Sequence, residues 1–428
     1  MITRRRLIRN GALAAGAALT LGRAARGAAS DPPLPPALAQ LKPRRSEARP
    51  ITREERGERR EHARRLMAER GLDAIVLAEG TSLQYFCGVH WWGSERLFAA
   101  VLPARGEPFY VCPAFEEGRA REQLANGTDP ERADVRTWQE DDSPYARLAQ
   151  GLKDRAIAAG RIGLEENVRF VFADGIAGAA PQARLVSATP VTAGCRMIKS
   201  AHEIDLMRLA AKVTLAAYEA TYRSLKPGMT QKDVAKMVET AHRQLGFEGG
   251  ADVQVGEYSA LPHGSITPQE IREETIVLMD GGCWVEGYAS DISRTYVLGK
   301  ASDKMKQVFD IVHRAQSAAL ATAKPGVEAG SVDAAARKVI SDAGYGPDYK
   351  YFTHRVGHGM GMDGHEWPYL VRGNTTKLQP QMTFSDEPGV YIRGEFGVRL
   401  EDDMHILENG AELFTPQSPS LEDPFGKG

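Results

Sequence analysis

Two aspartates, Asp280 and Asp291, flank a stretch with the pattern of a β-hairpin. An apolar run over residues 275–279 leads into Asp280, a second strand-like run starts at Tyr288, and Glu286-Gly287 between them favours a tight turn. The midpoint of the two aspartates lies beside that turn, so a hairpin would bring both carboxylates to about the same level, although sequence does not fix the register. Facing carboxylates repel each other, and proteins usually offset such repulsion with a metal ion bound between them. The alternative is two solvated aspartates on a surface hairpin.

A second stretch of the chain repeats this arrangement. Lys226-Pro-Gly228 recurs as Lys324-Pro-Gly326, and each copy is followed by an expected helix, a His-Gly pair and a hairpin with two acids. The repeat predicts two similar halves related by a pseudo-twofold axis, with a site between them where the acids converge. The second hairpin is centred on Gly394. The His-Gly pairs begin at His263 and His358, and the acids are Asp280 and Asp291 in the first copy and Glu387 and Glu401 in the second.

These four carboxylates and the imidazole of His358 suit two hard-to-borderline divalent ions better than one structural zinc. Two such ions can share a hydroxide at neutral pH and polarise a carbonyl group. That chemistry hydrolyses an amide without a covalent enzyme intermediate.

Three histidines, His354, His358 and His365, lie close together among glycines that permit close backbone approach. A lone histidine is more often structural, but this clustering favours a site. A histidine that does not bind metal could donate a proton or stabilise an oxyanion. Arg399 precedes Glu401 by two residues, so a strand would place both on one face, where Arg399 could pair with a metal-binding acid or a substrate carboxylate. The alternative for Arg399 is an ordinary surface arginine.

Composition is that of a globular protein of two domains. The chain has 428 residues, of which 42% are hydrophobic and 26% charged, and its net charge of −2 gives no case for nucleic acid or an anionic membrane as a partner. None of the four cysteines forms a C-x-x-C pair, so we expect buried free thiols, with a single disulfide as the alternative.

The N-terminus has the pattern of a targeting segment. A basic stretch over residues 3–9 precedes a weakly apolar one over 11–21 that is too short to span a bilayer, and small residues follow at Gly27 and Ala29. Residues 1–29 therefore predict a signal peptide of the twin-arginine type, hence a periplasmic or secreted protein with no stable membrane insertion after signal removal. The alternative is a basic amphipathic tail. Residues 30–50 predict a stiff, disordered linker.

Strands alternating with helices over residues 51–195 predict an α/β domain. Its expected strands cover residues 73–78, 98–102, 108–112, 133–138 and 161–165, and its expected helices cover 52–70, 115–124 and 145–159. Ser200 and Glu203 form a capping-box pattern that opens a helix to about Leu225, and Thr230 can cap a second helix to Leu245.

Six motifs follow one another between about residues 200 and 415. They are Asp280-Gly-Gly, Gly287-Tyr-Ala-Ser-Asp-Ile-Ser-Arg-Thr, Gly357-His-Gly-Met-Gly, His365-Glu366, Glu387-Pro-Gly-Val-Tyr and Val398-Arg-Leu-Glu-Asp. In these motifs the chain resembles the pita-bread metallopeptidases, a family that includes methionine aminopeptidase, aminopeptidase P, prolidase and creatinase. The resemblance implies an α+β pita-bread domain over residues 196–428 with a pseudo-twofold repeat, preceded by a smaller α/β domain like that of prolidase and creatinase.

The resemblance also implies roles for individual residues. Asp280 would bind one metal ion in bidentate fashion, Asp291 and Glu401 would bridge both ions, and His358 and Glu387 would bind the second. Glu387 would also take a proton from the bridging water. Manganese is the expected metal, with zinc, cobalt or iron as variants. The histidines His263, His354 and His365 match those that orient the scissile carbonyl and assist proton transfer, and Arg399 matches an arginine of the prolidase and aminopeptidase P branch.

The implied function is that of an exported, dinuclear-metal-dependent Xaa-Pro peptidase that hydrolyses the bond between an N-terminal residue and proline by a metal-bridging hydroxide. Its partners would be a short proline-containing peptide and a second copy of the chain in a homodimer. The alternative is a metal-dependent hydrolase or lyase of a small non-peptide metabolite on the same scaffold. A binding module with a dead site is disfavoured because all five ligands are present.

Overall fold

The computed structural model describes residues 33–125 and 133–426. The expected signal peptide, residues 1–29, lies outside the described residues. Within the described ranges, no helix combines the length and apolar character that a bilayer crossing requires.

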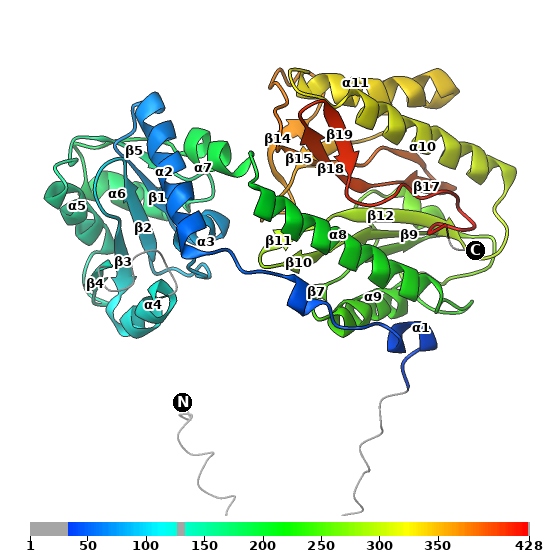
Figure 1. Ribbon diagram of the computed structural model, residues 1–428, viewed down its shortest axis with the longest axis horizontal. Coiled ribbons are helices and arrows are strands. Elements are labelled where there is room, and N and C mark those ends of the chain that lie inside the picture. Colours follow the sequence, from blue (N-terminus) through cyan, green and yellow to red (C-terminus); the bar gives the residue numbers. More distant parts are fainter. Residues whose placement is uncertain (1–32, 126–132, 427–428) are drawn as a thin grey trace, which may run out of the picture. The chain divides into compact units, whose positions relative to one another are not determined.

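The N-terminal domain is built on a six-stranded sheet with the order β4-β3-β2-β1-β5-β6 (Figure 1). The pairs β1–β2 and β2–β3 are antiparallel, whereas β3–β4, β1–β5 and β5–β6 are parallel. Every residue of β1, β2 and β3 is buried, as expected for strands with helices on both faces. The strands are β1 (Ala74–Leu77), β2 (Ala99–Pro103), β3 (Phe109–Pro113), β4 (Asp134–Trp138), β5 (Arg161–Leu164) and β6 (Arg184–Ser187).

The helices of this domain agree with the expected pattern only in part. The expected helix over 145–159 ends at Asp154, and Ala156 has a left-handed φ of 57° that a continuing helix excludes. Helix α6, strand β6 and helix α7 were not predicted from the sequence. The helices are α2 (Arg53–Arg70), α3 (Thr81–Cys87), α4 (Glu117–Leu124), α5 (Pro144–Asp154), α6 (Phe170–Ala179) and α7 (Thr189–Arg196).

The expectation of a disordered linker over residues 30–50 was wrong for its described part. A short helix, α1 (Pro36–Ala39), buries Leu38 to 1% exposure, and a 3-10 turn, η1 (Arg45–Glu47), follows. The backbone N–H of Arg44 donates to the carbonyl of Leu245 at 2.8 Å. The Arg45 side chain also donates to the carbonyl of Gly246 at 3.3 Å, and Ala37, Leu41 and Ala48 pack against the same core as Leu38. Apolar burial and these hydrogen bonds hold the proline-rich segment on the C-terminal domain.

The helices that open the C-terminal domain, which covers residues 196–428, are set by their caps. In α8 (Ala201–Tyr222) Ser200 and Glu203 form the predicted capping box, and in α9 (Gln231–Leu245) Thr230 and Asp233 form another. Gly246, with a φ of 92°, ends α9. The helix α8 ends at Tyr222, slightly before the expected Leu225.

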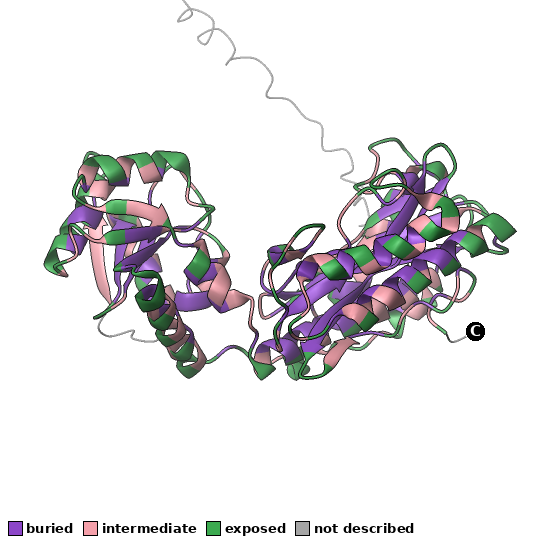
Figure 2. Ribbon diagram, turned by 90° about the horizontal axis from the view of Figure 1, so that it is seen from above, coloured by how far each residue is buried: buried purple, intermediate pink, exposed green. Residues whose placement is uncertain are grey.

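The C-terminal domain has the expected α+β organisation of two halves. In each half a pair of helices packs together and a hairpin follows, with α8 and α9 in the first half and α10 (Asp303–Thr322) and α11 (Ala329–Ile340) in the second (Figure 1). Figure 2 shows that the strands are largely buried while the helices keep exposed outer faces. The strands of the first half are β7 (Glu248–Gly249), β8 (Asp252–Val255), β9 (Ile276–Gly281), β10 (Cys283–Val285), β11 (Tyr288–Ala289) and β12 (Ile292–Val297). Those of the second are β13 (Gly357–Gly359), β14 (Glu366–Leu370), β15 (Thr383–Asp386), β16 (Gly389–Ile392), β17 (Phe396–Arg399), β18 (Asp402–Leu407) and β19 (Gly410–Leu413).

The first hairpin turns where expected, but its register differs. Glu286 and Gly287 have φ values of 50° and 89°, as a two-residue turn requires. Strands β9 and β12 pair Asp280 with Ser293, so Asp291 lies two residues nearer the turn than the residue that faces Asp280. A shift of two residues keeps the side chain on the same face of the strand, so both aspartates still reach one cavity. The second hairpin has the expected register, with Gly389 opposite Arg399 and Gly394 in the turn.

Candidate metal centre

All nine side chains singled out in the sequence line one cavity of about 380 Å³ in the catalytic domain. They come from both halves of the repeat and from six separate segments of the chain. The nine residues are His263, Asp280, Asp291, His354, His358, His365, Glu387, Arg399 and Glu401.

The five expected metal ligands fall into two groups that share one residue. One group contains Asp280, Asp291 and Glu401, the other contains His358, Glu387 and Glu401, and the ligand atoms within each group lie within 4.8 Å of one another. A third group, which contains Asp291, His358 and the further histidine His365, meets the same distance limit. Glu401 lies between β17 and β18 and forms a bridge with Ser293 of β12, which joins the two hairpins. The two groups match the pattern of a dinuclear site with a shared carboxylate.

The electrostatics of the five residues fit divalent cations. Burial, and then Asp280, raise the pKa of Asp291 to about 7, while burial and Asp291 raise the pKa of Glu401 well above its usual range. Glu387 behaves differently. Although burial opposes ionisation, the hydrogen bond with His358, at 3.2 Å, lowers the pKa of Glu387 to about 2. Carboxylates this crowded oppose one another's ionisation, and divalent ions bound among them would remove that penalty.

Arg399 and Ser293 hold the acids of the first group. Nη2 of Arg399 donates to Asp280 at 2.6 Å, and its Nε donates to the Ser293 hydroxyl at 3.0 Å. That hydroxyl lies 2.8 Å from Asp280 and 2.6 Å from Glu401. A hydroxyl has one proton, so it can donate to only one of these acids at a time. Sequence reasoning missed Ser293, although its two-residue spacing from Asp291 was a signal that both share a face.

Tyr391 connects Arg399 to His354. Its hydroxyl accepts a hydrogen bond from Nη1 of Arg399 at 2.8 Å and lies 2.7 Å from Nε2 of His354. Nδ1 of His354 lies 2.8 Å from the carbonyl of Arg355, which can only accept, so Nδ1 carries the proton and Nε2 accepts from Tyr391. Tyr391 was also missed, although it follows Glu387 by four residues and β-strand alternation would have placed it on the same side.

His365 and His263 complete the wall of the cavity. The ring of His365 stacks on that of His358 with 3.7 Å between their centroids. Burial and the neighbouring His358 lower the pKa of His365 to about 4, so His365 is neutral at physiological pH. Its Nδ1 lies 3.1 Å from Nη2 of Arg355. His263 lies in the loop that follows the 3-10 turn η3 (Gly256–Ala260).

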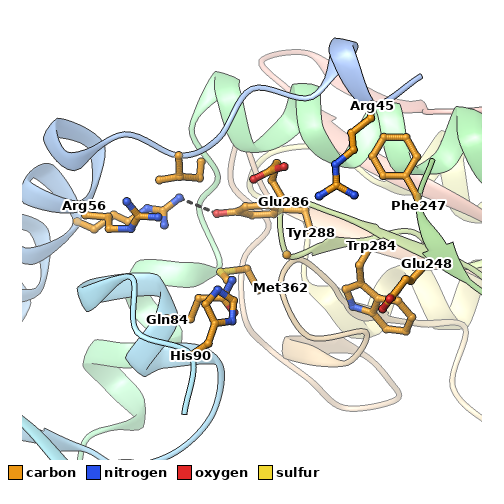
Figure 3. Close-up of a pocket in the computed structure, with 13 residues that line it drawn as sticks. Arg45, Arg56, Gln84, His90, Phe247, Glu248, Trp284, Glu286, Tyr288 and Met362 are labelled. Atoms are coloured by element: carbon orange, nitrogen blue, oxygen red, sulfur yellow. Dashed lines mark hydrogen bonds between the residues drawn. The ribbon is translucent and has the colours of Figure 1, made fainter. Parts of the chain in front are cut away.

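A larger cavity, of about 640 Å³, lies beside the first hairpin turn (Figure 3). Its lining includes Arg56, His90, Trp284 and Tyr288, and it contains none of the nine side chains. Nη2 of Arg59 donates to the Tyr288 hydroxyl at 2.6 Å across it. The smaller cavity, which contains all nine of these side chains, is therefore the candidate active site.

Comparison with known proteins identifies the family of both domains. The model of metallopeptidase family M24 matches residues 205–408, and the model of the creatinase/prolidase N-terminal domain matches residues 59–198. A Xaa-Pro dipeptidase of Lactobacillus delbrueckii subsp. lactis is 32% identical over 365 residues, which cover 83% of this chain and 96% of that protein.

Two solved structures show the same fold. The dipeptidase PepE of Mycobacterium ulcerans is 33% identical with a TM-score of 0.81, and the match covers 87% of this chain and 99% of that one. A prolidase of Thermococcus sibiricus is 30% identical with a TM-score of 0.75, and the match covers 84% and 96% of the two chains. With this fold, this cavity and these relatives, the chain belongs to metallopeptidase family M24, as a pita-bread enzyme that carries a creatinase/prolidase N-terminal domain.

Proposed function

We propose that this metallopeptidase hydrolyses the peptide bond between an N-terminal residue and a following proline, using two divalent ions for which manganese is the expected identity. The observation that carries the proposal is the pair of ligand groups that share Glu401 in a cavity also lined by His263, His354 and His365. Three histidines beyond the five ligands supply the proton donors and oxyanion partners that amide cleavage needs. The printed names of the relatives, Xaa-Pro dipeptidase and prolidase, support the choice of substrate.

Each residue has a proposed task. Asp280, Asp291, His358, Glu387 and Glu401 would hold the ions, which when bound supply Lewis acidity and lower the pKa of water. Glu387, with a pKa of about 2, is ionised at neutral pH and can accept a proton from the attacking water. His263 and His365 would orient the scissile carbonyl and pass a proton to the prolyl nitrogen. His354, whose two ring nitrogens are engaged by the Arg355 carbonyl and the Tyr391 hydroxyl, would support them from the cavity wall. Arg399 would keep Asp280 in place.

The test is metal depletion followed by reconstitution. Chelator-treated protein should not hydrolyse Xaa-Pro peptides and should recover with Mn²⁺, because the proposed chemistry needs the ions. Asp291→Ala should remove activity and lower the metal content. Glu387→Ala should retain some metal and lose turnover. Arg314→Gln, which removes a surface ion pair with Asp310 on α10, serves as the control.

Activity that survives Asp291→Ala would refute the proposal. If the metal-loaded protein hydrolyses none of a panel of Xaa-Pro dipeptides and tripeptides, the alternative activity would be favoured, that of a hydrolase or lyase acting on a non-peptide metabolite.

We also propose that residues 1–29 direct export through the twin-arginine route to the periplasm or the medium. The support is the order of a basic stretch, a weakly apolar stretch and small residues. A folded reporter fused after residue 35 should be exported, and replacing Arg4 and Arg5 by lysine should retain it in the cytoplasm. If the reporter with both replacements is still exported, the proposed route would be contradicted.

A further inference from the structure

The larger cavity, of about 640 Å³, shares no lining residue with the cavity of the metal centre. Its volume falls within the range of small-molecule sites, about 300–1,000 Å³. Its walls come from helices α2 and α3, the segment after α9 and the turn of the first hairpin (Figure 3). Because the chemistry assigned above uses none of these side chains, the cavity is a separate candidate for binding.

Four charged side chains that line this cavity form no ion pair within the residues that the structure describes. They are Arg45, Arg56, Glu248 and Glu286. The remaining arginine of the lining, Arg59, is paired with the buried Glu203 at 3.3 Å. Two positive and two negative side chains balance each other, which favours a ligand that carries one charge of each sign over a simple anion.

Arg56, on helix α2, marks one end of the cavity. In the described part of the chain its guanidinium has no hydrogen-bond partner, and its Nε is buried. Burial, and then the neighbouring Arg59, lower the pKa of Arg56, so a negative charge beside it would be stabilised. Gln84 lies on the same side of the cavity in Figure 3 and offers amide N–H donors. A guanidinium and an amide together suit a carboxylate.

The opposite end of the cavity suits a cation. Trp284 of β10 and Glu248 of β7 are directly paired, so their side chains project next to each other from one face of the small sheet. Trp284 is 53% exposed, and Glu248 is exposed as well. A carboxylate beside an exposed indole attracts an ammonium group by its charge and by cation–π attraction. Figure 3 shows this pair and Arg56 at opposite ends of the cavity.

We propose that this cavity is a second binding site, whose ligand is a short peptide with free termini. The C-terminal carboxylate binds at Arg56, and the N-terminal ammonium binds at Glu248 and Trp284. A free α-amino acid is too short to reach both ends, because one carbon atom joins its two charged groups, whereas each further residue adds about 3.5 Å. The proposal does not depend on which bond the metal centre cleaves.

The test is titration calorimetry of the Mn²⁺-loaded protein with triglycine, which contains no proline. Wild type should bind triglycine more tightly than N-acetyltriglycine or triglycinamide, by roughly tenfold in each case, because each blocked peptide loses one contact between charged groups. Free glycine should bind more weakly than triglycine. Arg56→Gln should lose the preference over triglycinamide, and Glu248→Gln should lose the preference over N-acetyltriglycine. Arg65→Gln, which replaces an exposed arginine of the same helix, is the matched control.

A further variant separates the two cavities. Asp291→Ala changes a residue of the metal centre that does not line the larger cavity, so its affinity for triglycine should stay at the wild-type level. Loss of triglycine binding in Asp291→Ala but not in Arg56→Gln would place the peptide at the metal centre and overturn the proposal.

Two results with wild type alone would also overturn it. Equal affinity for triglycine and N-acetyltriglycine would show a site for anions only, and absence of triglycine binding would show that the cavity takes no such peptide. Neither result bears on the hydrolysis of Xaa-Pro peptides, which is measured by turnover and metal reconstitution.

Discussion

At the scale of single residues, the buried carboxylates of the site repel one another, and a bound metal ion would offset that repulsion. Asp291 is a ligand candidate whose pKa is raised to about 7, because burial and then Asp280 oppose its ionisation. Its ordinary pKa is 3.8, so the folded protein binds the proton more tightly than the unfolded chain. Without metal, Asp291 therefore costs stability as the pH rises from about 4 to 7, and the cost is complete above that range.

Asp291→Asn should consequently have opposite effects with and without metal. At pH 8 the metal-free variant should melt at a higher temperature than metal-free wild type, with a gain on the order of 1–4 kcal/mol. In saturating Mn²⁺ the order should reverse, because only wild type gains the full binding free energy of the ions. Calorimetric melting temperatures of both proteins in chelator and in Mn²⁺ check this. A metal-free variant that melts below wild type would contradict it.

At the scale of elements, helix α9 is held against α8 and the first hairpin by a buried histidine. His242 is fully buried, and its Nδ1 lies 2.9 Å from the carbonyl of Val238, which can only accept. Nε2 therefore accepts from the hydroxyl of Thr214 at 3.3 Å, and that hydroxyl also contacts Ser290 at 2.9 Å. This arrangement fits only the neutral imidazole, and burial accordingly lowers the pKa of His242 to about 4.

The packing of α9 should weaken in mild acid. The pKa of His242 is lower in the folded than in the unfolded protein, where it is about 6.5, so stability is complete above pH 6.5 and falls as the pH drops toward 4. The expected loss between pH 7.5 and 5 is about 2 kcal/mol. Melting temperatures at both pH values should show a smaller drop in His242→Gln than in wild type, both measured without metal. An equal drop in the two proteins would contradict the assignment.

At the scale of the whole molecule, Arg196 ties the N-terminal domain to the loop that carries His365. It lies at the end of α7, donates to Glu366 and to Asp363, and has a side chain that is 12% exposed. Nζ of Lys199 also lies 3.3 Å from Glu366. Although burial opposes ionisation, these cations lower the pKa of Glu366 to about 2. The segment that follows His358, a proposed metal ligand, is thus anchored by an arginine at the end of the last helix of the N-terminal domain.

Arg196→Ala should leave Glu366 buried with only one cation. We expect a loss of about 3–5 kcal/mol in stability and a lower kcat/KM, because the loop under His365 loses an anchor. Melting curves and Ala-Pro kinetics measure the two effects. Arg314→Gln, an exposed arginine with an ion pair on α10, should stay within about 0.5 kcal/mol of wild type. Wild-type kinetics in Arg196→Ala would contradict a role for the anchor in the site.

Much of the fold could be read from local signals. The capping residues Ser200 and Thr230 and the turns at Glu286-Gly287 and Gly394 lie where sequence placed them, because each is set by its own side chain or by the freedom of glycine. Features that depend on distant contacts were missed. Leu38 orders a proline-rich segment only because α8 and α9 offer it a surface, and no local pattern reports that surface.

The sequence by itself determined which side chains could perform the chemistry, since the spacing of acids, histidines and glycines is a property of the chain. Only the tertiary structure decided how they are used. It paired Asp280 with Ser293 instead of Asp291 and committed Arg399 to the acids. The reason is that register and charge pairing depend on which segments meet in space, and residues far apart in the chain meet only after both halves have folded together.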